Sequence, residues 1–136
     1  MIVDTSALIA VHLRENGWEP LRDALVEEEA LVPAPVIVEF NLVTSLPAND
    51  PDPDAGVLLS KFLTRSCRVC AFSDDDAAMS AEAHRLHGRG NGRGGKLNML
   101  DVMVYCMAKR HGRPILCTGR DFSSTDARIH PASRPW

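Results

Sequence analysis

Three acidic side chains stand at positions that a parallel sheet would bring to one edge. Asp4 follows an apolar opening, MIV, that predicts a first strand, with a helix beginning at Thr5 or Ser6. Asp101 lies in the first turn of a predicted helix, and Asp121 follows a short apolar strand. Because ligands bind at the carboxyl ends of parallel strands, we expect these carboxylates to lie close together.

A fourth acid, Glu39, is distinguished by its isolation. It is the single charged residue between Leu31 and Leu46. The segment around it, PAPVIVEFNLV, predicts a helix with Pro35 in its first turn. Since the neighbours on both sides are apolar, an ordinary exposed position explains this acid poorly.

Four converging carboxylates have a definite chemistry. Carboxylates ~4–5 Å apart repel each other by several kcal/mol at an effective dielectric of about 20. A fold that gathers them must protonate some or bind cations. An all-oxygen ligand set without an organised His or Cys favours Mg²⁺ or Mn²⁺ over Zn²⁺. Two such ions ~3.5–4 Å apart can activate water and neutralise the leaving oxygen of a phosphodiester.

The elements that position these acids follow from the last third of the chain. Asn98 is the predicted N-cap of a helix, and Asp101 lies near its positive dipole end. Gly112 and Pro114 end that helix, and a brief buried strand follows at 115–117. The helix carries its apolar stripe on Val104, Met107 and Ala108.

The rest of the chain alternates strands and helices. Further helices are predicted at 5–14, 19–29, 54–65 and 74–87, with strands at 31–32, 68–72 and, as a last edge, 127–130. Pro47–Pro53 is a predicted loop, and Trp136 ends a tail. This order predicts a three-layer α/β/α fold around a short, mostly parallel sheet.

Composition places limits on the class of protein. A chain of 136 residues with 45% hydrophobic content predicts one domain over 1–136. Nothing approaches 18 consecutive apolar residues, and the N-terminus lacks a basic segment, so we expect a cytoplasmic protein with no membrane span or signal peptide. The four cysteines do not form the pattern of a disulfide framework.

The charge is unevenly distributed along the chain. The net charge of −3 by itself argues against nucleic acid. However, residues 1–64 hold 3 basic and 11 acidic side chains, whereas residues 65–136 hold 12 basic and 7 acidic ones. Such polarity indicates an anionic partner. The candidates for binding backbone phosphates are Arg89, Arg93, Lys96 and Arg120.

The order of the four acids along the chain resembles that in PIN-domain ribonucleases, and most closely that in VapC-type toxins from bacterial toxin–antitoxin pairs. The acids are Asp4, Glu39, Asp101 and Asp121. The resemblance is carried by VDTSAL, VIVEFNLV and LNMLDVMVYCMAKRHGRPILCTGRDFSSTD. It covers nearly the whole chain, apart from the segment 47–70. One departure is Leu100, where the family often has Gly.

The resemblance implies a PIN-like fold and Mg²⁺- or Mn²⁺-dependent hydrolysis of RNA. Asp4, Glu39 and Asp101 would be the main metal ligands, and Asp121 would help to place a second ion or the attacking water. Family members are typically homodimers that cut specific RNAs and are inhibited by a small antitoxin covering the acidic groove.

Three further polar residues are candidates for supporting roles. Ser6 would hydrogen-bond a ligand carboxylate, or is an ordinary helix-start serine. Asn98 would hold the helix that carries Asp101. Asp126 would be a fifth carboxylate or a cap of the turn in which it lies.

Two motif matches are misleading. The glycine-rich stretch His87–Lys96 fits both G-x-G-x-x-G and most of a P-loop, but it follows a helix, and Leu97 replaces the Ser or Thr that would bind magnesium. It is either a mobile basic loop near RNA phosphates or a flexible connection. Cys67-x-x-Cys70 with His84-x-x-His87 approaches zinc-finger spacing, but strand residues three apart face opposite ways.

Two other functions compete with hydrolysis of RNA. A haloacid-dehalogenase-like phosphatase would need a second Asp at position 6, where Ser6 stands, and phosphoenzyme trapping on Asp4 would support it. A non-catalytic RNA- or protein-binding module would have no reason to keep four mutually repelling acids. Metal-independent RNA binding without cleavage would support that module.

Overall fold

A four-stranded parallel sheet lies at the centre of the protein. The computed structural model describes residues 1–46 and 65–134. The strands are β1 (Ile2–Val3), β2 (Ala30–Pro33), β3 (Cys67–Cys70) and β4 (Ile115–Leu116), in the order β3-β2-β1-β4. Ile2 pairs with Leu31 on one side and with Ile115 on the other. The predicted short, parallel α/β sheet is therefore confirmed.

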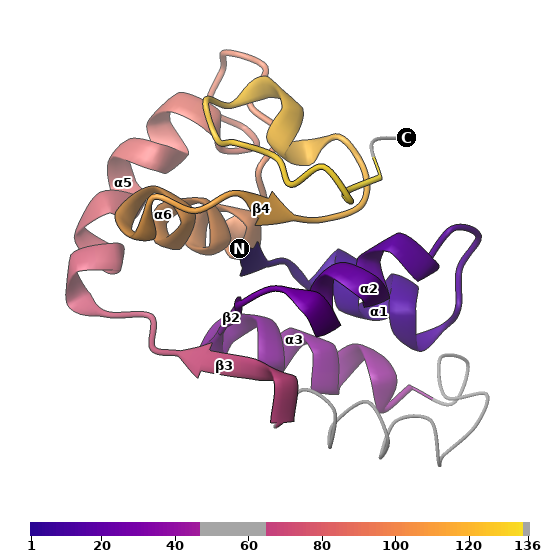
Figure 1. Cartoon of the computed structure of the whole chain (residues 1–136). Helices are drawn as coiled ribbons and strands as arrows, with labels where there is room; N and C mark the ends of the chain where they lie inside the picture. Colours follow the sequence, from indigo (N-terminus) through magenta and orange to yellow (C-terminus); the bar gives the residue numbers. More distant parts are fainter. Residues whose placement is uncertain (47–64, 135–136) are drawn as a thin grey trace.

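Helices cover the sheet on both sides. They are α1 (Thr5–His12), α2 (Glu19–Glu27), α3 (Ala34–Thr44), α5 (Asp74–His87) and α6 (Met99–His111), with a 3₁₀ turn, η2, at Asp121–Ser124. Figure 1 shows α1, α2 and α3 grouped on one side and the α5–α6 pair on the other. Within the described residues, no helix is long and apolar enough to cross a membrane.

The core consists of the strands and the inner faces of these helices. Both residues of β1 are fully buried, as expected for a central parallel strand with helices on both faces. The largest fully buried side chains include Leu8, Leu21, Leu25, Leu31, Val36, Leu97, Met107, Ile115 and Leu116. The predicted stripe of Val104, Met107 and Ala108 is buried.

Local capping fixes where α5 and α6 begin. Asn98 and Asp101 form a capping box at the start of α6, and Gly112 ends that helix in the left-handed conformation, at φ 61°. Ser73 and Asp76 form a second capping box at the start of α5. The fully buried Asp76 also accepts hydrogen bonds of 2.6 and 2.9 Å from Arg110 of α6, so one ion pair ties the two helices together.

Several predicted boundaries were wrong. The first helix, predicted to reach Arg14, ends at His12 because Arg14 takes a left-handed conformation at φ 50°. The second ends at Glu27 rather than Glu29, since the chain is already extended at Glu28 as it approaches β2. The strand predicted at 68–72 occupies Cys67–Cys70, where every residue has a partner on β2.

The end of the chain also differs from the prediction. The strand predicted at 115–117 ends at Leu116, which pairs with Val3, the last residue of β1. The edge strand predicted at 127–130 is a single bridge between Ile115 and Ile129. The loop predicted at Pro47–Pro53, nearly all of the helix predicted at 54–65, and Trp136 lie outside the described residues.

Candidate active site

The four predicted acids line one cavity of about 310 Å³ at the carboxyl edge of the sheet. Asp4 follows β1, Glu39 comes from α3, which begins where β2 ends, and Asp101 lies in the first turn of α6. Asp121 begins the η2 turn beyond β4. Thus four segments spread over 118 residues of sequence contribute one carboxylate each to the same wall.

Asp4 is held rigidly between the sheet and α1. Its backbone N–H donates to the carbonyl of Leu116 at 2.9 Å, as an extension of the β1–β4 pairing. Its Oδ2 accepts hydrogen bonds from the backbone N–H of Ser6 at 3.0 Å and from the Ser6 hydroxyl at 2.5 Å, so Asp4 is the N-cap of α1.

Burial makes the ionised form of Asp4 costly. Burial is the main cause that raises the pKa of Asp4 from 3.8 to about 6. The two hydrogen bonds from Ser6 oppose that rise, while the negative charges of Asp101 and Glu39 add to it. A cation in the cavity would reverse both unfavourable effects, because it would replace lost hydration and neutralise the neighbouring carboxylates.

Asp101 is positioned by the cap of α6. Its Oδ2 accepts a 2.7 Å hydrogen bond from the backbone N–H of Asn98, which leaves Oδ1 for a ligand. Burial raises the pKa of Asp101, and the charges of Asp121 and Glu39 raise it further, whereas Arg89 lowers it. The negative charges of neighbouring acids thus raise the pKa of both Asp4 and Asp101, consistent with their common cavity.

Ser6 and Asn98, two predicted supporting residues, both line this cavity. The Ser6 hydroxyl donates to Asp4 and accepts a 3.0 Å hydrogen bond from the backbone N–H of Thr118, so it joins the first acid to the end of β4. The side-chain oxygen of Asn98 accepts from the backbone N–H groups of Leu100 and Asp101.

Asp126 does not line the cavity. Its carboxylate instead accepts 2.7 and 2.8 Å hydrogen bonds from the Tyr105 hydroxyl and the Lys109 ammonium, both on α6. This contact ties the loop that carries Asp121 to the helix that carries Asp101. The structure therefore gives Asp126 a contact with α6 in place of a fifth position among the cavity carboxylates.

The four predicted phosphate-binding cations are all exposed, and one of them, Arg89, acts on an acid of the cavity. Arg89 lies near Asp101, as its effect on that carboxyl's pKa shows. Arg93, Lys96 and Arg120 are exposed. The glycine-rich loop that carries three of these cations has a defined shape: the side-chain oxygen of Asn91 accepts from the backbone N–H groups of Arg93 and Gly95, at 2.8 and 3.1 Å.

Three cavity-lining polar residues, Thr5, Glu15 and Thr118, were not predicted as site residues. Thr118 follows β4 by two residues, and the strand-end argument that selected Asp121 applies to it equally. Glu15 lies in the turn after α1, and nothing in its sequence neighbourhood distinguishes it from an ordinary surface acid.

The donor set suits a hydrated divalent cation. Across residues 1–46 and 65–134, no three His, Cys, Asp or Glu side chains converge closely enough to hold a metal ion as they stand, and this includes the rejected Cys/His zinc pattern. Mg²⁺ does not need such a cage, because it keeps several waters and binds through one or two carboxylates. A cavity of about 310 Å³ with carboxylates around it has room for both ions and water.

Comparison with known proteins gives a consistent result. The PIN domain model matches residues 1–128. Ribonuclease VapC42 of Mycobacterium tuberculosis is 36% identical over 130 residues, which cover 94% of this chain and 97% of that protein.

Two solved structures share the fold at low sequence identity. One is the sarcin–ricin-loop-cleaving toxin VapC20 of M. tuberculosis, with a TM-score of 0.69 at 16% identity over 93% of this chain and 95% of that one. The other is VapBC2 of Rickettsia felis, bound to a promoter DNA fragment, with a TM-score of 0.72 at 12% identity over 99% and 97%.

Proposed function

The chain belongs to the PIN domain family, and we propose that it is a metal-dependent endoribonuclease, the toxin of a toxin–antitoxin pair. The observation that carries this proposal is the meeting of Asp4, Glu39, Asp101 and Asp121 in one cavity at the carboxyl edge of the sheet. Relatives that are named ribonucleases match along almost the whole chain, which supports the same reaction class.

We propose that Asp4, Glu39 and Asp101 hold Mg²⁺ or Mn²⁺, with Asp121 helping to place a second ion or the attacking water. Such an ion lowers the pKa of bound water and neutralises charge on the leaving oxygen when it is bound. The protein's contribution is to fix the ligand oxygens: Ser6 orients Asp4, and the cap of α6 orients Asp101.

Substrate binding is assigned to the basic second half of the chain. The residues that would contact RNA phosphates are Arg89, Arg93, Lys96 and Arg120. Such phosphate contacts give an affinity that depends on salt, but they carry no sequence information. Their charge compensates the acidic cavity, which by itself would repel a polyanion.

The remaining proposals follow from the family. Solved relatives include toxin–antitoxin complexes, which supports a small antitoxin as the protein partner. We further propose that residues 1–136 form a single domain, that the protein is a homodimer, and that it acts in the cytoplasm, where RNA is found.

The test uses the purified, partner-free protein and a mixed RNA pool, with and without Mg²⁺ or Mn²⁺, alongside an Asp4→Asn variant. We expect cleavage that requires the metal and is lost in the variant. RNA binding without metal and without cleavage would instead support a non-catalytic module. Failure of the folded wild type to bind either metal, measured by calorimetry, would overturn the four-carboxylate site.

A further inference from the structure

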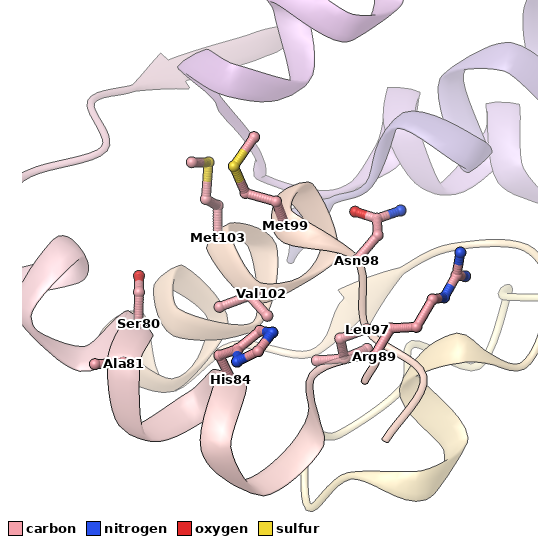
Figure 2. Close-up of a pocket in the computed structure, with 9 residues that line it drawn as sticks. All are labelled: Ser80, Ala81, His84, Arg89, Leu97, Asn98, Met99, Val102 and Met103. Atoms are coloured by element: carbon pink, nitrogen blue, oxygen red, sulfur yellow. The ribbon is translucent and has the colours of Figure 1, made fainter. Parts of the chain in front are cut away.

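A second cavity, of about 640 Å³, opens between α5 and α6 beside the acidic one. Figure 2 shows it bounded by α5 on one side and by the first turns of α6 on the other. Its walls are mainly apolar, from Leu97, Met99, Val102 and Met103. The volume falls within the range of sites that bind small organic groups, about 300–1,000 Å³.

The two cavities share a wall. Asn98 lines both of them. Its side-chain oxygen is used by the cap of α6, whereas the amide nitrogen, Nδ2, has no acceptor among the residues that the structure describes. A donor is therefore available at the boundary between the acidic cavity and the apolar one.

His84 supplies a second polar group on the opposite side. Its ring lies against the backbone of Gly88, where an added Cβ would lie 2.3 Å from a ring carbon, and this exposed imidazole forms part of the cavity wall. Neither ring nitrogen of His84 is hydrogen-bonded to another group in the described parts of the chain. The ring can thus offer both an aromatic face and a hydrogen bond.

Arg89 adds a positive charge at the rim. It lines the second cavity and lies close enough to Asp101 to lower the pKa of that carboxyl. In Figure 2 its guanidinium extends away from the apolar floor to the side on which Asn98 lies. The cation therefore lies on the side of the second cavity where Asn98, which lines both cavities, is found.

We propose that this second cavity, the base cavity, binds one unpaired nucleobase of the RNA substrate next to the nucleotide that is cut, while Arg89 binds the phosphate between the two. The inference rests on the proposed nuclease function and deepens it, since it places a sequence-reading contact beside a centre that handles phosphates only. Recognition of single-stranded RNA commonly uses bases splayed into such sites, with stacking and a few hydrogen bonds.

The chemistry of the cavity favours RNA over a protein segment. An apolar peptide side chain would use the walls but not the cation at the rim or the free donor of Asn98. A nucleotide uses all three, because it combines a flat apolar ring, hydrogen-bonding edges and an anionic phosphate. Because the two cavities adjoin at Asn98, a single RNA strand can also occupy both of them.

Two tryptophan substitutions on α5 separate the possibilities. Ala81 is exposed and lines the base cavity, so Ala81→Trp places a bulky indole at the cavity wall, where it would obstruct a base, without removing a core contact. Ala78 is exposed on the same helix but outside that lining, which makes Ala78→Trp the matched control. Both are tested for RNA binding in an Asp4→Asn background by anisotropy of a fluorescent single-stranded RNA, and for cleavage of an RNA pool by sequencing the ends.

We expect Ala81→Trp to weaken RNA binding about tenfold, within the range for losing one stacked base, and to reduce the nucleotide preference at one position beside the cut. Ala78→Trp should match the parent. An abasic nucleotide at that position should weaken binding to the parent protein by the same factor and have no further effect in Ala81→Trp.

RNA affinity in Ala81→Trp equal to that in the control would overturn the inference. If binding of a protein partner were lost instead while RNA cleavage stayed the same, the occupant would be a peptide. Failure of the proposed nuclease would give a different result. The wild type with Mn²⁺ would then hydrolyse neither RNA nor the small diester bis(p-nitrophenyl) phosphate. The anisotropy experiment would still show whether the base cavity binds RNA, because it does not depend on cleavage.

Discussion

Replacing Asp4 with Asn should make the metal-free protein more stable at neutral pH. Asp4 is only 7% exposed, and burial is the main cause that raises the pKa of its carboxyl from 3.8 to about 6. That difference corresponds to about 3 kcal/mol, by which the buried charge lowers the free energy of unfolding above pH 6. Asn removes the charge, and its Oδ1 can still accept both hydrogen bonds from Ser6 and cap α1.

The size of the effect must change with pH. Because folding raises the pKa of Asp4, the stabilisation from its bound proton is full below pH 3.8, decreases as the pH rises through about 6, and is lost above it. The Asn variant should therefore exceed the wild type in stability at neutral pH and approach it near pH 3.8, where Asp4 is protonated as well.

Urea unfolding in EDTA, followed by tryptophan fluorescence, measures this difference at both pH values. Added Mn²⁺ should reverse the order at neutral pH, since a bound ligand stabilises only the folded protein that binds it. Asp74→Asn, an exposed acid in the first turn of α5, is the control and should cost at most about 1 kcal/mol. A metal-free Asp4→Asn protein less stable than the wild type at neutral pH would refute the reasoning.

Other variants test the contacts around the site and between the helices. Ser6→Ala should reduce cleavage by about 10–100-fold while leaving Asp4 in place, because it removes the hydroxyl that orients the carboxylate; steady-state kinetics on an RNA substrate would measure it. Asp76→Ala should lower the free energy of unfolding by about 3 kcal/mol, because it leaves Arg110 without its buried partner; an unchanged urea midpoint would contradict this. Tyr105→Phe should lower the free energy of unfolding by about 1 kcal/mol, because it removes the hydrogen bond from the Tyr105 hydroxyl to the carboxylate of Asp126; thermal unfolding would measure this loss.

Much of the acidic site could be predicted from local sequence. Asp4 and Asp121 were found because each follows a short apolar strand, and Asp101 because it begins a well-capped helix. Parallel topology then brings strand ends and helix starts to one edge without further information. Glu39 needed a different signal, namely a lone charge within an apolar helix.

What the sequence did not predict depends on contacts between distant segments. Glu15 reaches the cavity through the path of the turn after α1, and no local pattern records that path. The partners of Asp126 lie on α6, 17 and 21 residues earlier in the sequence. The boundary errors have the same origin: β3 ends at Cys70 because its partner strand ends there, and the last segment meets the chain around β4 at two separate bridges, Ile115–Ile129 and Thr118–Arg134, rather than along a continuous strand.

The strand order also determines when the acidic cavity can form during protein synthesis. The first strand to be made is one of the two inner strands, and it pairs with β4, which is among the last parts of the chain to be translated. Until β4 leaves the ribosome, Asp4 lacks the sheet neighbour that holds its backbone, and Asp121 has not yet been placed. Folding that depends on such distant pairing is slow to begin. A chain interrupted before Ile115 therefore contains three of the four carboxylates but cannot close the sheet edge that assembles them.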